Sequence, residues 1–151
     1  MSLKHWILGV LAMVLLGCES PHMEYRMVGC ASLPSPRAAA TSFVVGDYAY
    51  VFGGRDSAGT YLNDLWQYDT QNDTWTSLGK TPLKERVNAT ACVHDGVAYI
   101  GLGFNGRYSN STGYLQDWWK YDPNTNTWQP LSNYPAHTTA RAVCMVGEGE
   151  L

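Results

Sequence analysis

Short runs of apolar, β-branched and aromatic residues follow one another along the chain, and turn-forming Gly, Asn, Asp and Pro separate them. None of these runs shows a sustained helical period. Continuous runs such as residues 48–52 are typical of strands that pack on both faces. The pattern predicts eight strands, over residues 39–45, 48–53, 64–69, 74–78, 89–93, 97–101, 117–122 and 127–131. We therefore predict an all-β protein with tight turns.

The two halves of the chain contain a repeated segment. Residues 63–69 read Asn-Asp-Leu-Trp-Gln-Tyr-Asp and precede Trp75, while residues 116–122 read Gln-Asp-Trp-Trp-Lys-Tyr-Asp and precede Trp128. A period near 50 residues indicates supersecondary units that stack to bury a shared core. Residues 142–148 restate residues 41–47. We therefore expect a third unit to begin here, and the chain to be the N-terminal part of a longer array.

The repeated residues resemble the kelch signature, which combines a glycine pair with a Tyr-to-Trp spacing. The resemblance implies four-stranded antiparallel blades of a β-propeller, here incomplete, with blades at 34–80 and 81–133 and the start of a third repeat at 134–151. The second copy departs from the pattern because Leu102 precedes its glycine. The residues that carry the motif are expected to serve packing and backbone conformation: Gly53, Gly54, Tyr68, Trp75, Gly103, Tyr121 and Trp128.

The N-terminus carries a separate signal. Lys4 and His5 precede an apolar run at 6–16 that is too short to span a bilayer and ends in Gly17-Cys18. This segment resembles the lipobox of bacterial lipoproteins, which implies a signal peptide at 1–17 and a lipidated Cys18. Residues 19–33 show no hydrophobic period, so we expect a poorly ordered tether there. The alternative is an ordinary signal peptide or N-terminal anchor in which Cys18 is incidental.

The lipobox resemblance implies a membrane partner, through the lipid anchor, and a place in the bacterial cell envelope. Glu19 rather than Asp follows the cysteine. We therefore expect the outer membrane or the cell surface rather than the inner membrane.

Charge and cysteine content limit the partners and sites that we expect. The net charge is −3 and no basic run occurs, so we expect no nucleic-acid partner. Cys30, Cys92 and Cys144 have no metal-ligand spacing, and we predict neither a disulfide, a metal site nor a cofactor. Cys92 and Cys144 occupy the same repeat position as Phe43 in this alignment, which favours small buried side chains over reactive thiols.

Loops supply the candidate binding residues. In a four-stranded blade, the loops after the second and fourth strands emerge on one face, which would gather residues 55–61, 79–86, 104–114 and 132–141. The second unit carries a four-residue insertion between Gly103 and Asp117, and such insertions often lie on a binding face. Arg55 in the segment 55–61, and Arg107 and Tyr108 in the segment 104–114, are candidate ligand-binding residues. A sugar site and an ordinary solvated loop both fit this composition.

Arg37 and Arg86 recur immediately before the innermost strand of each unit. Both are candidates to bind a ligand carboxylate at the mouth of the channel, since a guanidinium matches a carboxylate in geometry. The structural alternative is an arginine that donates hydrogen bonds to loop carbonyls. Residues 69–73 weakly resemble a calcium loop but lack the following Gly and distal Glu, so we predict a hairpin turn.

Two functions remain open. The first is an anchored binding or interaction module for carbohydrate or protein ligands. The alternative is a carbohydrate-active enzyme similar to the kelch mutarotases and epimerases that act on sialic acid, although the catalytic residues are unknown. Copper radical oxidases also contain kelch blades, but nothing in the sequence places His94, His137 or a cysteine as that chemistry requires.

Overall fold

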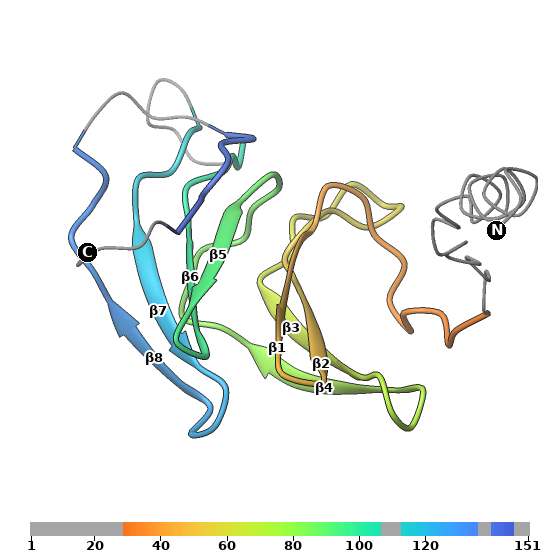
Figure 1. Cartoon of the computed structure of the whole chain (residues 1–151). Helices are drawn as coiled ribbons and strands as arrows, with labels where there is room; N and C mark the ends of the chain where they lie inside the picture. Colours follow the sequence, from red (N-terminus) through yellow and green to blue (C-terminus); the bar gives the residue numbers. More distant parts are fainter. Residues whose placement is uncertain (1–28, 107–112, 136–139, 147–151) are drawn as a thin grey trace, which may run out of the picture.

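The residues that the structure describes form two four-stranded antiparallel sheets (Figure 1). The computed structural model describes residues 29–106, 113–135 and 140–146. The first sheet contains β1 (Thr41–Val45), β2 (Tyr48–Phe52), β3 (Asp64–Asp69) and β4 (Thr74–Lys80). The second contains β5 (Thr90–His94), β6 (Val97–Gly101), β7 (Trp118–Asp122) and β8 (Thr127–Pro130). The predictions for the signal peptide, Cys18, Arg107 and Tyr108 lie outside the described residues.

The strand order in each sheet follows the chain order, so every neighbouring pair is a simple antiparallel hairpin or longer connection. Each strand begins and ends within two residues of its predicted range. The ladder between β3 and β4 shifts its register between Leu65 and Trp66, which marks a bulge in the first sheet. The prediction of four-stranded, all-β units is therefore confirmed.

One hydrophobic core lies between the two sheets, because β1 packs beside β5. Phe43 stacks on Tyr50 with ring centroids 4.9 Å apart, and Tyr121 of the second sheet meets both rings edge-on. Phe52 and Ile100 are fully buried in the same cluster. Each sheet thus covers the apolar face of the other, as expected of stacked repeat units.

The segment 140–146 lies on the second sheet in the way that the second sheet lies on the first. Thr41 Oγ1 donates to Ala89 O at 2.6 Å, and Thr90 Oγ1 donates to Ala142 O at 2.8 Å. Arg141 N likewise donates to the carbonyl of Asn88 at 3.2 Å. The structure assigns no strand to residues 140–146. Its contacts nevertheless repeat those that join the first two sheets.

The two cysteines that we predicted to be unpaired form a disulfide. Cys92 and Cys144 are bonded, with their Cα atoms 5.5 Å apart. The sequence comparison treated Cys144 as equivalent to Cys92. The threonine hydrogen bonds instead make Ala142 equivalent to Ala89, and therefore make Cys144 equivalent to Ala91. This difference of one residue brings the side chains of Cys92 and Cys144 together between β5 and the segment 140–146. The disulfide joins β5 covalently to the segment 140–146.

This arrangement predicts a specific thiol reactivity in the purified protein. Cys30 is free and exposed, so it is expected to react with a maleimide reagent without prior reduction. Cys92 and Cys144 are expected to react only after a reductant is added. Peptide mass spectrometry before and after reduction measures this difference. Labelling of Cys92 in the untreated, natively folded protein would contradict the disulfide.

The prediction of a poorly ordered tether is wrong for Ala31. Its backbone N–H donates to Asp73 Oδ1 at 2.6 Å, and Trp75 Nε1 donates to its carbonyl at 2.8 Å. The indole and the carboxylate at the edge of the first sheet therefore hold the chain before β1.

In the described part of the chain, no helix is long and apolar enough to cross a membrane.

The glycine pair takes the same backbone conformation in both units despite the change of residue. Gly53 and Gly54 have φ angles of 63° and 97°, and Leu102 and Gly103 have 56° and 95°. An added Cβ at Gly103 would lie 2.7 Å from the carbonyl oxygen of Val87. The second position of the pair therefore requires glycine in both its conformation and its space.

Candidate functional site

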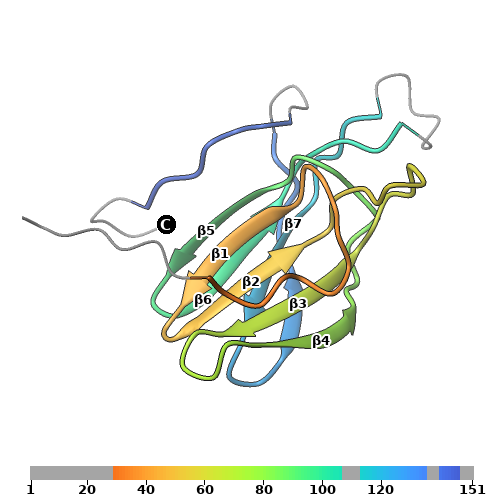
Figure 2. The same cartoon turned by 90° about the vertical axis from the view of Figure 1, so that its right-hand side faces the viewer.

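The connections between strands gather at two opposite ends of the sheets (Figure 2). Tight hairpins lie at one end, and the β2–β3 loop, the β4–β5 linker and the β6–β7 loop lie at the other, which we call the loop face. Isolated bridges pin the base of each long loop: Arg55 pairs with Ala38 and Tyr61, and Phe104 pairs with Val87 and Tyr114. The predicted gathering of these loops on one face is therefore confirmed for the described residues.

A hollow of about 460 Å³ opens on the loop face between the two units. Its wall combines the end of the β2–β3 loop, the linker and the β6–β7 loop. The residues that line it include the polar residues Thr60, Asn63, Lys80, Glu85 and Asn105 together with Tyr61 and Leu62. We call this the first hollow.

A second hollow of about 400 Å³ occupies the corresponding place in the second unit. Tyr114, Gln116 and Asp117 line it at the repeat positions that Tyr61, Asn63 and Asp64 hold in the first hollow. Asn133 stands where the first hollow has Lys80. The hollows thus share a framework that the repeat dictates, and differ in their charged residues.

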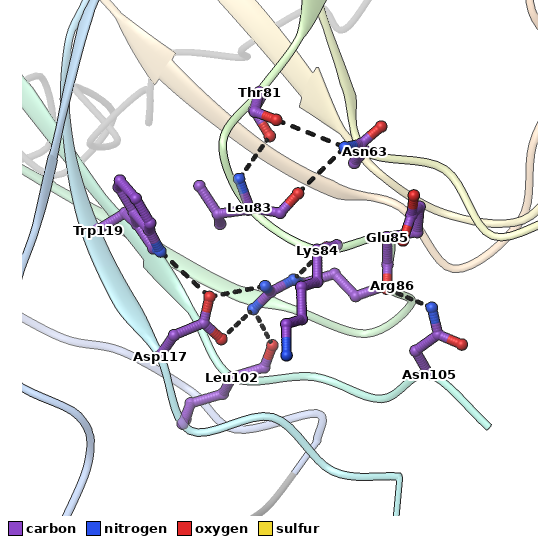
Figure 3. A network of polar contacts seen from close by, with 10 residues as sticks. All are labelled: Asn63, Thr81, Leu83, Lys84, Glu85, Arg86, Leu102, Asn105, Asp117 and Trp119. Carbon is purple, nitrogen blue, oxygen red and sulfur yellow. Dashed lines mark hydrogen bonds and ion pairs between the residues drawn. The ribbon is translucent and has the colours of Figure 1, made fainter. Parts of the chain in front are cut away.

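Both units hold the linker between them in place (Figure 3). Asn63 Nδ2 donates to the carbonyls of Thr81 and Leu83, at 3.4 and 3.1 Å. Asn105, which is only 1% exposed, donates from Nδ2 to Glu85 O at 2.6 Å. These hydrogen bonds from side-chain amides satisfy backbone carbonyls that a loop buried between two blades would otherwise leave unpaired. They also fix the wall of the first hollow.

Arg86 forms the centre of this network. Its guanidinium donates to both carboxylate oxygens of Asp117, each at 2.8 Å, and also to the carbonyls of Leu102 and Lys84. The Arg86 side chain is fully buried, and Trp119 Nε1 adds a third donor to the Asp117 carboxylate at 3.1 Å. The carboxylate that faces this arginine therefore comes from the protein itself.

Arg37 repeats the arrangement in the first unit. Its guanidinium donates to both oxygens of Asp64, at 2.6 and 2.9 Å, and to Gly53 O at 3.0 Å, while Trp66 Nε1 donates to the same carboxylate at 2.7 Å. The Arg37 side chain is 2% exposed. For both arginines this geometry matches the structural alternative and leaves little of the guanidinium for a ligand.

The two aspartates stay ionised because of these partners. Burial acts to raise the pKa of Asp117, but the hydrogen bonds and positive charge of Arg86 outweigh it and hold the pKa below its ordinary value. The pKa of Asp64 is lowered in the same way against desolvation, by Arg37 and the indole of Trp66. Both sites are therefore ion pairs at neutral pH.

The lowered pKa values predict a loss of stability in acid. A carboxyl whose pKa is lower in the folded state contributes stability above its unfolded value, near 4, and loses it as the pH falls through the folded pKa. We expect the unfolding midpoint in urea to fall between about pH 5 and pH 3, and Asp117→Asn to flatten that fall. An equally steep fall in the variant would contradict this assignment.

The remaining predicted site residues are distributed unevenly. Arg55 is exposed at the start of the β2–β3 loop, where a ligand can reach it. Asp69 accepts hydrogen bonds from the backbone N–H groups of Gln71 and Asn72, which confirms a hairpin turn at 69–73.

His94 lies at the end of β5, and its Nε2 is 3.4 Å from Asp95 Oδ2. Within the described ranges, no three acidic, histidine or cysteine residues gather as metal ligands.

The sequence did not reveal the partners of the arginines or the wall of the first hollow. Asp64 and Asp117 recur in the repeated segment, once in each unit, as Arg37 and Arg86 do. The pairing of one arginine with one aspartate in each unit could therefore have been inferred. Asn63 opens the repeated segment and Lys80 lies in the predicted loop segment 79–86, but neither position showed what its side chain would contact. Their roles depend on the path of the linker, which local sequence does not determine.

Two stacked four-stranded sheets with repeated glycine, tyrosine and tryptophan positions define kelch-type propeller blades. The family model described as "KLHDC2/KLHL20/DRC7 Kelch-repeats domain" matches residues 13–148. The chain belongs to the kelch-repeat family.

Individual relatives agree with this membership. Kelch domain-containing protein 3 of Rattus norvegicus is 30% identical over 118 residues, which cover 70% of this chain and 30% of that protein. Kelch-like protein 25 of Xenopus tropicalis is 30% identical over 114 residues, covering 74% of this chain and 19% of the relative. The solved structure of YjhT matches with a TM-score of 0.65 at 25% identity, over 75% of this chain and 43% of the other. The chain thus spans less than half the length of each of these proteins.

Proposed function

We propose that the protein is a binding module of the cell envelope that uses its loop face to hold a carbohydrate or protein ligand. The observation that carries this proposal is that bonds and packing within the blades occupy the repeated side chains, whereas the loop face offers hollows with different charged residues. The repeated arginines, aspartates and aromatic residues bond or pack within the blades, while the hollows and Arg55 lie on the loop face. Kelch-repeat propellers are typically interaction modules, which supports a binding role.

A blocking experiment tests the binding role. In a Cys30→Ala background, a bulky polyethylene glycol maleimide is attached to Ser57→Cys on the β2–β3 loop or, as the control, to Gln71→Cys in the hairpin at the opposite end. Both positions are exposed. Binding is read on an array of glycans and peptides. We expect the group at position 57 to abolish binding and the group at position 71 to leave it unchanged. Equal binding by both conjugates would place the ligand elsewhere.

The disulfide supports an exported location. Disulfides persist in oxidising compartments and are rare where thiol reductants are abundant. The bond between Cys92 and Cys144 is therefore consistent with the signal peptide and lipobox that the sequence predicts at residues 1–18. Under this proposal the lipid on Cys18 holds the protein at the membrane surface, and residues 19–30 lead to the attachment at Ala31.

The anchor has a direct test. Cys18→Ala removes the acylated residue, so we expect the protein to move from the membrane fraction to the soluble fraction of the envelope. Cys30→Ala is the matched control, because it removes a nearby free thiol without affecting lipidation. Immunoblots of the two fractions measure the change. Full membrane association of Cys18→Ala would refute lipid anchoring.

The alternative is a sugar mutarotase or epimerase similar to the kelch enzymes that act on sialic acid. Arg37 and Arg86 were the candidate partners for the acidic group of such a substrate, and Asp64 and Asp117 occupy both. The alternative therefore has to rely on other residues. Proton NMR of N-acetylneuraminate anomers with the protein tests it: faster interconversion supports an enzyme, and an unchanged rate counts against one.

A further inference from the structure

We propose that the first hollow, between the two blades, is a binding site for an uncharged saccharide. This inference rests on the proposed binding function and names its ligand class and its position. The hollow has a volume of about 460 Å³, which falls within the usual range of about 300–1,000 Å³ for small-molecule sites. It lies on the loop face and draws its wall from three separate connections.

Three residues that line the hollow carry polar groups that a ligand can use. Thr60 Oγ1, Asn63 Oδ1 and Lys80 Nζ have no hydrogen-bond partner among residues 29–106, 113–135 and 140–146. They offer a hydroxyl that donates and accepts, a carbonyl that accepts and an ammonium that donates. Sugar hydroxyls both donate and accept, so this mixed set matches a polyhydroxylated ligand better than one of a single polarity.

The charges of the hollow favour a neutral ligand. The Asp64 carboxylate accepts two hydrogen bonds from Arg37 and one from Trp66, so its charge is already compensated. Lys80 and Glu85 contribute one positive and one negative side chain to the wall. The lining therefore has no excess charge that would select an anion or a cation. Tyr61 and Leu62 add apolar lining that suits the C–H groups of a sugar.

The hollow is organised before any ligand arrives. Asn63 Nδ2 is held by the carbonyls of Thr81 and Leu83, which fixes the orientation of the amide (Figure 3). Asn105 holds the carbonyl of Glu85 from the other side of the linker. A fixed wall lowers the conformational entropy lost on binding, and that loss is large relative to the few contacts of a small sugar.

The repeat supplies a matched control for this site. Lys80 and Asn133 occupy equivalent positions in the first and second hollows. Both side chains are exposed, so their substitution is not expected to disturb the fold. Lys80→Gln removes the ammonium from the first hollow, whereas Asn133→Ala alters only the second. Thr60→Val provides another test within the first hollow, because it removes the hydroxyl with little change in shape.

The experiment is a titration of the full chain with glucose, galactose, N-acetylglucosamine and N-acetylneuraminate, followed by ligand-observed NMR and calorimetry. At least one of the three uncharged sugars is expected to bind more tightly than N-acetylneuraminate. Lys80→Gln is expected to weaken that binding about tenfold, as for loss of a charge-assisted hydrogen bond. Thr60→Val is expected to weaken it severalfold, and Asn133→Ala to leave it unchanged.

The other outcomes overturn the inference in distinguishable ways. No binding of any uncharged sugar at about 50 mM, far above the millimolar affinities of weak sites, would refute the ligand class. If the loop face still bound peptides or larger glycans in the blocking experiment, the proposed function would survive. Tighter binding of N-acetylneuraminate would show an acidic ligand. Sugar binding that Lys80→Gln does not change would place the site outside the first hollow.

Discussion

Replacing Arg86 by Met is expected to lower the free energy of unfolding by about 3–5 kcal/mol. The Arg86 side chain is fully buried and donates to both oxygens of Asp117 and to the carbonyls of Leu102 and Lys84. Methionine fills much of the volume but leaves the Asp117 carboxylate without its counter-ion. Urea denaturation followed by tryptophan fluorescence measures the loss.

A second variant separates the cost of breaking the ion pair from its net contribution. In Arg86→Met with Asp117→Leu, no unpaired charge remains, so we expect more than half of the lost stability to return. Trp119 still loses the acceptor for its indole N–H, which limits the recovery. A single variant as stable as the original protein would show that the pair does not hold the linker. A double variant less stable than Arg86→Met would contradict the explanation by an unpaired charge.

Replacing Gly103 by Ala is expected to destabilise the second blade by about 3 kcal/mol, the upper range for a strained backbone. The residue has a φ of 95°, and its new Cβ would lie 2.7 Å from Val87 O and 3.1 Å from Ala89 Cα. Backbone atoms on both sides prevent an easy adjustment. The loss of stability is again measured by urea denaturation.

Gly96 provides the control, because it also has a positive φ, 74°, but no atom would lie within 4 Å of an added Cβ. Gly96→Ala is therefore expected to cost only the conformational part, about 1–2 kcal/mol. Leu102 already shows that a non-glycine residue can hold a φ of 56° in this fold. Equal losses at Gly103 and Gly96 would mean that crowding behind the glycine pair is not what requires glycine.

The strands and their order were predictable because local signals and the repeat agree. Turn residues mark both hairpin ends, and the 53-residue spacing of Trp75 and Trp128 assigns equivalent positions in the two blades. The arrangement of loops on one face follows from the strand order alone. These features depend on local propensity and on the copied pattern, which one sequence contains.

The disulfide and the arginine partners were not predicted, for different physical reasons. Cys92 and Cys144 meet because the segment 140–146 is offset by one residue from the position that the repeated sequence gives it. Treating the two cysteines as equivalent positions hides this contact. The recurrence of Arg37 and Arg86 was clear from the sequence. Whether they bind a ligand or stabilise the fold depends on which carboxylate reaches them. Such pairing is a property of tertiary structure.

The candidate site was predictable only in outline. The loop face was expected, and Arg55 lies exposed on it. The first hollow was not expected, since it requires Lys80 at the end of one blade and Asn105 in the next to line the same space. The path of the linker, fixed by Asn63 and Arg86, brings them together. No local pattern encodes that path.

The two blades share one hydrophobic core, so we expect each to stabilise the other. Amide hydrogen exchange in the full chain measures this mutual stabilisation. The N–H groups of β2 and β6, which are central strands, are expected to exchange slowly and with similar opening free energies. Strong protection in β2 together with rapid exchange in β6, or the reverse, would contradict the shared core.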